Sequence, residues 1–567
     1  MSDTAVLEAQ APEDDEVLVH INRRAQFMTL GAVMLGMLLG SLDQTIVGTA
    51  MPKIVNDLNG FQHYSWVVTG YLVASTAMMP IFGKISDIFG RKWLYMLGIA
   101  TFLAGSMLSG VAQTMDQLIL FRAVQGLGAG MMTPIAMAII GDIFPPAERG
   151  KYQGLIGAVF GLAMIVGPQL GGFITDNVGW RWVFYVNVPV AILAFAVVFL
   201  VFPSHTALHK RHSIDWLGSA ALIGSVVPLL MALSLGSTNP DNANSYGWTS
   251  PQIVGLFAVA LVLGAVFLRS QARAAEPTIP LALFRNRIFN VSMIIVFLTS
   301  MGMFGAILYI PLFVQDVLMQ SATNSGLVLT PMMMGVILVS IVSGYLMSRT
   351  GRYKVLAIVG TAGVLVGLYL LSTMTVNTDN GTLVRYMVVL GLGLGTSMSL
   401  FTIVVQNAFP VDRLGVVTAS LAFFRSIGGA VGVAVLGSAM NNRFASEFQA
   451  GLQTAPAQMR QTLATANPTQ LMNAGDSDLR ALMGAQAAHV VESVRASAIA
   501  LGVAEIFLIG AALVAIAFVA SFFLKEIPLR KTRHDVPAPA PAAEPAPAAA
   551  QAPAAEPVQP GLPQAST

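Results

Sequence analysis

The sequence predicts an all-α integral membrane protein with fourteen membrane-spanning helices. Of its 567 residues, 55% are hydrophobic and only 10% are charged, and the mean hydropathy is +0.71. Soluble domains, in contrast, carry about 25% charged residues. Long apolar runs recur along the chain, and Lys and Arg residues gather in alternate segments between them. A multi-span membrane protein is the class that fits these three observations.

The spans follow from the lengths of the apolar runs, because a helix needs about 20 mostly apolar residues to cross a bilayer. Six such runs occupy the first third of the chain and eight more follow. The fourteen runs cover roughly residues 28–48, 65–84, 93–113, 116–140, 151–175, 181–202, 215–235, 251–269, 289–311, 323–347, 354–374, 383–407, 413–439 and 498–524.

The distribution of basic residues orients these spans, since cytoplasmic loops of membrane proteins are enriched in Lys and Arg. With the N-terminus inside, 21 of the 30 Lys and Arg residues fall in cytoplasmic segments. Residues 1–27 are polar and acidic and do not resemble a cleavable signal peptide. We therefore expect a multi-pass protein of the plasma (inner) cell membrane with both termini in the cytoplasm.

Two segments are predicted to lie outside the bundle. Residues 440–497 are expected to form a long extracytoplasmic loop that carries one or two amphipathic helices against the outer face. Residues 525–567 are rich in Pro and Ala and have too few apolar residues to bury a core. We expect a disordered cytoplasmic tail there.

A charged decapeptide after the second run has a second copy later in the chain. "GKISDIFGRK" occupies residues 83–92, and "GYLMSRTGRYK" occupies residues 344–354. Three pairs of residues align, namely Gly83 with Gly344, Gly90 with Gly351 and Arg91 with Arg352. Ser348 takes the place of Asp87, so the two copies differ in charge.

The repeat divides the chain, because transporters are often built from repeated halves. A cytoplasmic segment, 1–27, precedes an N-terminal six-helix bundle at 28–202. Two extra spans with their linkers occupy 203–286. The C-terminal six-helix bundle is formed by 287–439 and 498–524.

With these motifs the chain resembles the major facilitator superfamily, whose signature between the second and third spans has the form Gly-x-x-x-Asp-x-x-Gly-Arg-Lys. Gly83, Asp87, Gly90, Arg91 and Lys92 match it. Four further motifs, "LDQTIVGTAMP" at 42–52, "RAVQGLGAG" at 122–130, "GPQLGG" at 167–172 and "WRWVFYVNVP" at 180–189, are similar to those of its fourteen-span drug:proton antiporter family. The resemblance implies the major facilitator fold and multidrug efflux, as in antibiotic resistance.

The signature decapeptide is implied by the resemblance to act as a cytoplasmic latch between the two halves. Asp87 could accept hydrogen bonds from helix-end amides and pair with an Arg, while Gly83 and Gly90 permit a tight turn. The alternative is that Arg91 and Lys92 act only as topological anchors.

Asp43 and Arg122 are charged residues within predicted spans. An aspartate costs about 3 kcal/mol there on insertion scales, so Asp43 should face a cavity or a partner. Because desolvation favours the neutral form of a carboxyl group, Asp43 is a candidate proton carrier. The resemblance implies proton coupling for Arg122, which cannot itself deprotonate. A fixed structural strut for Asp43 and packing against helix carbonyls for Arg122 are the alternatives.

Three further features are candidate site elements. Gly167, Pro168, Gly171 and Gly172 would leave a flat helix face, and the resemblance associates this motif with antiport. Generic close packing is the alternative. Arg425 is a further intramembrane charge on a small-residue face, "RSIGGAVGVAVLG". Glu505 could be a second proton or cation site, or a shallow residue bonded to the long loop.

The energy source is expected to be a proton gradient. The chain has no Cys and no Gly-x-x-x-x-Gly-Lys-[Ser/Thr] phosphate loop, so we expect no ATP-driven pump, no enzyme, no cofactor and no metal site. One charge crossing about 100 mV releases about 2.3 kcal/mol. A proton gradient therefore suffices to drive export.

These observations predict a proton-coupled exporter of hydrophobic or cationic small molecules that works by alternating access. Its partners are such substrates, protons and the lipid bilayer, with no nucleic acid, and the need for a periplasmic or extracellular adaptor stays open. Alternatives are a narrow-specificity exporter of a metabolite, lipid or antibiotic, a proton symporter that imports a nutrient, and a non-transporting sensor or assembly protein. The "GPQLGG" motif argues against import but not against narrow export.

Overall fold

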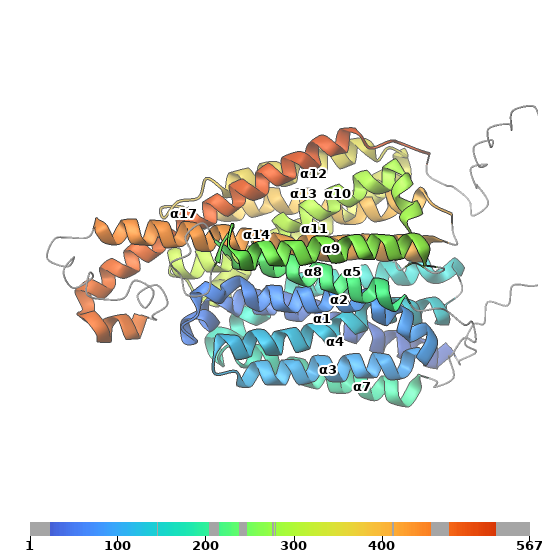
Figure 1. The fold of residues 1–567 in the computed structure, drawn as a ribbon, viewed down its shortest axis with the longest axis horizontal. Helices are drawn as coiled ribbons and strands as arrows, with labels where there is room; N and C mark the ends of the chain where they lie inside the picture. Colours follow the sequence, from blue (N-terminus) through green and yellow to red (C-terminus); the bar gives the residue numbers. More distant parts are fainter. Residues whose placement is uncertain are drawn as a thin grey trace, which may run out of the picture. The chain divides into compact units, whose positions relative to one another are not determined.

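The computed structural model describes residues 23–144, 146–202, 215–237, 246–274, 277, 279–410, 413–454 and 476–528. The N-terminal residues 1–22 and the predicted tail from residue 529 onward lie outside the described residues. The described chain is built almost entirely of long helices that run side by side (Figure 1).

The N-terminal bundle contains the first six predicted spans, and the sixth is preceded by a single helical turn, α6. Its elements are α1 (Arg23–Asp57), η1 (Phe61–His63), α2 (Tyr64–Phe89), α3 (Arg91–Val111), α4 (Met115–Ile143), α5 (Pro146–Asn177), α6 (Trp182–Tyr185) and α7 (Asn187–Val201).

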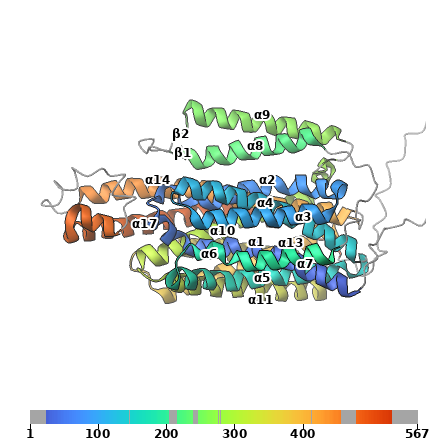
Figure 2. The ribbon, with the colours of Figure 1, turned by 90° about the horizontal axis from the view of Figure 1, so that it is seen from below.

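The two extra spans form a helical hairpin. It consists of α8 (Trp216–Leu235), β1 (Gly236–Ser237), β2 (Tyr246–Gly247) and α9 (Pro251–Arg273). The two short strands pair in parallel, Gly236 with Tyr246 and Ser237 with Gly247. Figure 2 shows α8 lying between α9 and the main bundle, where it contacts α2 and α14.

The C-terminal bundle repeats the six-span plan. Its elements are η2 (Leu281–Arg285), α10 (Arg287–Leu312), η3 (Phe313–Val317), α11 (Ala322–Thr350), α12 (Lys354–Leu371), α13 (Asn380–Asn407), α14 (Leu414–Gln453) and α17 (Asp476–Phe522). Side-chain caps begin several of these helices, as when Ser321 Oγ accepts from Asn324 N and Asp379 accepts from Thr382 N.

Thirteen helical spans of the described chain are long and apolar enough to cross a membrane. The 26-residue helix α2, which carries Lys84 and Asp87 near its end, is a further long helix. The predicted all-α membrane fold is therefore confirmed. The predicted runs at 215–235 and 251–269 correspond to α8 and α9.

The described parts of segment 440–497 are helical, as expected, but the helices continue the neighbouring spans and are not separate helices within a loop. α14 continues without a break to Gln453, and α17 already begins at Asp476. No Pro or Gly interrupts residues 438–450, and Ala, Glu and Gln in this stretch favour helix. The spans therefore extend beyond the bundle as helices, and only 455–475 lies outside the described residues.

The internal repeat is visible in the backbone. Gly90 joins α2 to α3 with φ 90°, and Gly351 ends α11 with φ 70°. Positive φ values at these two junctions favour glycine, because L-residues with a Cβ atom rarely adopt them. The two glycines aligned from the sequence thus mark equivalent turns in the two bundles.

The two bundles meet along a seam between α2 and α14 and a seam between α5 and α11, and α1 also contacts α10. At the end of the molecule that holds the α1–α2 connection, side chains and backbone of the two bundles form hydrogen bonds. These run from Tyr64 Oη to Leu308 O (2.7 Å), from Asn441 Nδ2 to Gln62 O (3.0 Å), from Arg495 Nη2 to Asn56 Oδ1 (2.6 Å) and from Gln315 Nε2 to Thr49 O (2.8 Å).

Aromatic rings also pack between the two bundles at the α1–α2 end. The rings of Phe61 and Phe444 lie 4.5 Å apart, and those of Tyr64 and Tyr309 stack at 5.6 Å. The two bundles are therefore joined at the α1–α2 end.

Candidate proton-coupling site

Asp43 lies within α1 and is 1% exposed. Its carboxylate accepts three hydrogen bonds from side chains of α4 and α7. Arg122 Nη1 donates to Oδ2 at 2.5 Å, Gln125 Nε2 donates to Oδ1 at 2.8 Å, and Asn187 Nδ2 donates to Oδ1 at 3.1 Å. The structure thus brings together Asp43 and Arg122, the two charges that the sequence placed on separate spans.

The network extends beyond the carboxylate. Arg122 Nη1 also donates to Gln125 Oε1 at 2.7 Å, and its guanidinium lies 4.4 Å above the ring of Tyr71. Asn187 Nδ2 donates to Ser106 Oγ at 3.1 Å, and Ser106 in turn donates to Phe184 O. Five helices, α1, α2, α3, α4 and α7, and the single turn of α6 therefore hold the site.

The glycines of "RAVQGLGAG" bring α4 close enough to its neighbours to place Arg122. A Cβ atom on Gly126 would lie 2.4 Å from the carbonyl oxygen of Tyr71 on α2. From the other side, a Cβ atom on Gly105 of α3 would lie 2.4 Å from Gln125 N. Real Cβ atoms do not approach so closely. α4 can therefore lie this close to α2 and α3 only because Gly126 and Gly105 have no side chain.

Asp43 can take up a proton only if its hydrogen bonds change. A carboxylate accepts hydrogen bonds and a protonated carboxyl group also donates one, so protonated Asp43 would lose at least one of its three donors. Arg122 stays charged throughout. Two buried atoms of the network, Arg122 Nε and Asn187 Oδ1, have no hydrogen-bond partner among the described residues. They are available to the new contacts that such a rearrangement requires.

The "GPQLGG" motif lies against α1 next to Asp43. A Cβ atom on Gly167 would fall 1.9 Å from Thr45 Oγ1, and one on Gly171 would fall 2.5 Å from Ile46 O. The other side of the motif meets the C-terminal bundle, because a Cβ atom on Gly172 would lie 2.4 Å from Ala322 O. The motif therefore packs α5 simultaneously against the acid-bearing helix and against the opposite bundle.

Pro168 shares this seam between the bundles. Its carbonyl oxygen lies 2.2 Å from the position that a Cβ atom on Gly326 of α11 would take.

The signature decapeptide spans the α2–α3 junction. Gly83 and Asp87 lie in α2, and the side chain of Asp87 lies outside what the structure describes. Arg91 is buried and donates to Ser86 Oγ at 3.2 Å. Lys92 is buried too and donates to Phe199 O at 2.8 Å. Both basic residues thus bond within the N-terminal bundle.

Glu505 and Arg425 lie away from the Asp43 network. The carboxylate of Glu505 on α17 pairs with Arg443 Nε at 3.1 Å, and 39% of the Glu505 side chain is exposed. Arg443 belongs to the part of α14 that we predicted as loop. Arg425, also on α14, lines a small pocket in the C-terminal bundle. Among the described residues, no cluster of His, Cys, Asp or Glu could hold a metal ion.

Sequence reasoning missed Asn187, Ser106 and Tyr71 as members of the site. Asn187 stands in the quoted "WRWVFYVNVP" stretch, and a polar side chain in an apolar run was the available signal. Ser106 and Tyr71 carry no comparable signal, because serine and tyrosine are common in membrane helices. Arg495, which lies within segment 440–497, is buried on α17 and contacts Asn56 and Asp316.

Known proteins resemble this chain in both sequence and fold. The profile described as Major Facilitator Superfamily matches residues 33–433. The Multidrug transporter protein MdtP of Bacillus subtilis is 38% identical over 88% of this chain and 93% of its own length. Multidrug resistance protein 3 of the same organism is 40% identical over 75% of this chain and 81% of its own length.

Solved structures share the fold at low sequence identity. A bacterial homolog of the human lysosomal transporter Spinster, in an inward-facing and unoccupied conformation, superposes with a TM-score of 0.59 at 16% identity, covering 89% of this chain and 98% of its own. Together with the two bundles and their glycine-rich seams, these matches show that the chain belongs to the Major Facilitator Superfamily.

Proposed function

We propose that the protein is a proton-coupled secondary transporter of the cell membrane that exports hydrophobic or cationic small molecules by alternating access. Family membership and relatives named as multidrug transporters support this class of function. The observation that carries the proton-coupling part is the buried Asp43 carboxylate on three side-chain donors. Buried ionisable residues inside a membrane bundle mark ion and proton pathways.

In the proposed mechanism, Asp43 alternates between a carboxylate and a carboxyl group. As a carboxylate it binds Arg122, Gln125 and Asn187 and holds α1, α4 and α7 together. Protonation removes its attraction for Arg122 and frees at least one donor. Because α5 packs on α1 through Gly167 and Gly171, a shift of α1 passes to the seam with α11.

The joined α1–α2 end is assigned to the outside of the cell, as the basic residues predict. The hydrogen bonds of Tyr64, Gln315 and Arg495 would then close the exit, and export requires them to open. Asp87, with Gly83, Gly90, Arg91 and Lys92, is proposed to latch the opposite end in the other state. Two discrete arrangements of packed helices are the usual basis of such switching.

Accumulation of a fluorescent dye in intact cells tests the proposal. Cells that express the protein should hold less dye than cells without it, and a protonophore should remove the difference. Asp43→Asn should show no efflux at equal membrane expression, because an amide cannot exchange the proton. Efflux that survives both the protonophore and Asp43→Asn would contradict proton coupling through this residue.

A further inference from the structure

The side-chain amide of Asn187, at the start of α7, has a nitrogen that donates twice and an oxygen that accepts from no described residue. Its Nδ2 donates to Asp43 Oδ1 and to Ser106 Oγ, each at 3.1 Å. Its Oδ1 is buried and has no hydrogen-bond partner among the described residues. Buried polar atoms without a partner are uncommon in proteins. The site therefore contains an acceptor that the carboxylate form of Asp43 does not use.

Protonated Asp43 needs an acceptor for its new O–H group, and its three partners differ in whether they can supply one. A guanidinium group only donates, so Arg122 cannot accept. The side-chain oxygen of Gln125 already accepts from Arg122 Nη1 at 2.7 Å, so turning this amide over would break that bond. The Asn187 amide can turn over without breaking any bond that its oxygen makes to a described residue. Among the three partners, Asn187 is therefore the one that can change from donor to acceptor.

Ser106 permits the same turn on the other side of the amide. Its hydroxyl group accepts from Asn187 Nδ2 and donates to Phe184 O at 2.8 Å. A hydroxyl group can rotate and donate in a new direction. When the amide turns over, its nitrogen and oxygen exchange places, so Asp43 and Ser106 can both donate to Asn187 Oδ1. Both contacts are kept with their hydrogen bonds reversed, and Ser106 gives up its bond to Phe184.

The surroundings of Asp43 determine which helix contact a proton changes most. Asp43, Ser106 and Asn187 are each no more than 1% exposed. Near the carboxylate, α4 contributes the cation Arg122 and α2 contributes the phenol of Tyr71, while α3 and α7 contribute the uncharged Ser106 and Asn187. A proton on Asp43 therefore removes the charge attraction between α1 and α4 but only reverses a hydrogen bond between α1 and α7.

We propose that Asn187 is the positioning residue of the proton site and that its amide turns over each time Asp43 takes up or releases a proton. An O–H bond forms at Asp43 Oδ1 and donates to Asn187 Oδ1, and no proton moves onto the amide. α1 stays joined to α7 in both states, so protonation weakens the contact between α1 and α4 selectively. This role rests on the proposed proton coupling and adds to it the residue that directs the effect of the proton.

Infrared difference spectra of the purified full-length protein, recorded between alkaline and acidic pH, test the turn of the amide. The carboxyl band of Asp43 is the one that is absent from Asp43→Asn. Asparagine bands are identified by producing the protein with asparagine labelled with carbon-13. On acidification the C=O stretch of Asn187 should move to lower frequency, because its oxygen then accepts from two hydroxyl groups. Loss of a bond from Nδ2 without the turn would move this band to higher frequency.

Asn187→Leu connects both bands to the named residue. This variant should remove the asparagine shift and move the Asp43 carboxyl band to higher frequency, because the O–H group loses its acceptor. Asn290→Leu is the matched control. It removes an asparagine of the C-terminal bundle whose Nδ2 donates to Phe284 O and whose buried Oδ1 likewise has no partner among the described residues. Both bands should stay in place in this control.

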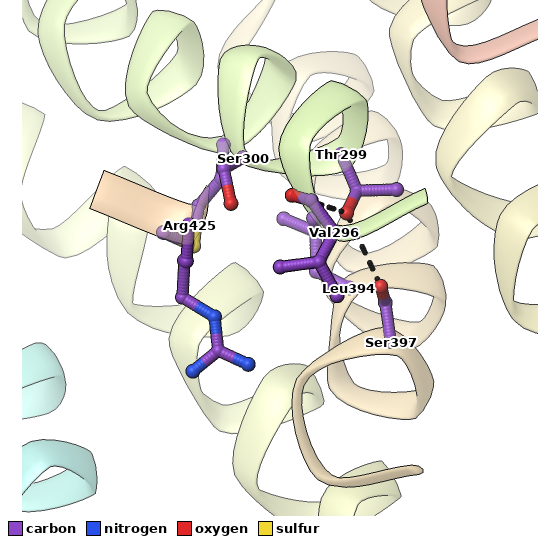
Figure 3. Close-up of a pocket in the computed structure, with 7 residues that line it drawn as sticks. Val296, Thr299, Ser300, Leu394, Ser397 and Arg425 are labelled. Carbon is purple, nitrogen blue, oxygen red and sulfur yellow. Dashed lines mark hydrogen bonds between the residues drawn. The ribbon is translucent and has the colours of Figure 1, made fainter. Parts of the chain in front are cut away.

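Ser106→Ala is a milder variant that keeps the test valid if Asn187→Leu does not fold. It removes one of the two donors to the turned amide, so the asparagine shift should be smaller. Ser397→Ala removes a buried hydroxyl group of the C-terminal bundle that lies 3.2 Å from Thr299 Oγ1 (Figure 3), and the full shift should remain.

Four spectral results would overturn the role of Asn187. These are an asparagine band that stays in place or moves to higher frequency in the unmodified protein, an asparagine shift that persists in Asn187→Leu, a carboxyl band that does not move in Asn187→Leu, and an undiminished shift in Ser106→Ala.

Dye transport in proteoliposomes separates the role of Asn187 from the proposed function. Asn187→Leu should lower the initial rate of gradient-driven accumulation about tenfold, as loss of one hydrogen bond to a charged group would give, and an unchanged rate would overturn the role. If the bands move as expected but a proton gradient drives no accumulation by the unmodified protein, the amide turn stands and proton-coupled export is contradicted. If Asp43→Asn abolishes gradient-driven accumulation but the asparagine band does not move, export stands and the role of Asn187 is refuted.

Discussion

The Asp43 carboxylate is satisfied entirely by side chains of other helices, which makes it a tertiary contact between α1, α4 and α7. A buried charge that loses its partner is costly, since removing one member of a buried pair destabilises proteins by about 3–5 kcal/mol. The network is therefore expected to contribute to stability as well as to coupling.

Removing the cation alone should destabilise the bundle. We expect Arg122→Met to lower the unfolding free energy by about 3–5 kcal/mol, because the Asp43 carboxylate would stay buried without its counter-charge. The double variant Asp43→Asn with Arg122→Met should regain most of this loss. Thermal unfolding of the purified variants measures both. An equal loss in the single and double variants would show that Arg122 acts by packing rather than by pairing.

The two junction glycines differ in what can replace them. Gly351 has φ 70° and ψ −4°, a left-handed conformation that Asn tolerates, whereas Gly90 has φ 90° and ψ 144°. Backbone in the second region is nearly restricted to glycine and costs other residues about 1–3 kcal/mol. Gly351→Asn should therefore unfold close to the unmodified temperature, and Gly90→Asn clearly below it. Equal unfolding temperatures would contradict the assigned backbone.

At the scale of the helices, small residues decide which spans touch. α5 is the element that connects the acid site to the opposite bundle, because Gly167 and Gly171 meet α1 and Gly172 meets α11. α8, in contrast, packs against α2 and α14 along the other seam, and α9 packs on the outer side of α8. The hairpin thus covers one side of the α2–α14 seam.

A methyl group on the seam glycine should block movement. In Gly172→Ala the new Cβ atom would lie 2.4 Å from Ala322 O, so α5 and α11 must separate. Overpacking of this kind costs about 1–3 kcal/mol, and we expect transport to fall while membrane insertion is retained. Gly344→Ala on α11 is the matched control, because no atom lies within 4 Å of its Cβ position. Equal transport by the two variants would contradict the claim that close packing between α5 and α11 is needed for transport.

Helix positions could be predicted from the sequence more fully than helix contacts. The positions of α8 and α9 could be predicted because polar residues bound each apolar run. Asp43 and Arg122 could be identified because a charge inside a membrane span is costly. The partners Asn187 and Ser106 could not be predicted, since hydropathy does not fix which face of a span meets which neighbour. Helix was expected in the polar ends of α14 and α17, but its continuity with the spans was not, because the polar residues there were taken to end each span.

At the scale of the whole molecule, transport requires the joined α1–α2 end to separate. The chain has no Cys, so an engineered pair of cysteines can hold the α1–α2 end closed without competing thiols. Ser65→Cys with Gly437→Cys would join α2 to α14. The Cβ atom of Ser65 lies 2.6 Å from the position of a Gly437 Cβ atom, so the two helices must move apart slightly to reach the separation of about 3.5–4.5 Å that a disulfide spans. Disulfide formation should stop transport, and reduction should restore it.

A second pair controls for the effect of a disulfide as such. Gly360→Cys with Thr396→Cys has the same 2.6 Å separation but joins α12 to α13 within the C-terminal bundle. This pair should leave transport intact when it is oxidised. If both oxidised pairs transport normally, the α1–α2 end does not have to open.

The coupling role of Asp43 is tested most directly in proteoliposomes, by comparing dye accumulation driven by a proton gradient with dye exchange at equilibrium. In Asp43→Asn, gradient-driven accumulation should be absent, while exchange of external for internal dye should continue, because the bundles can still rock without a proton carrier. Gradient-driven accumulation at the unmodified level in Asp43→Asn would contradict the assignment of Asp43 as the coupling residue.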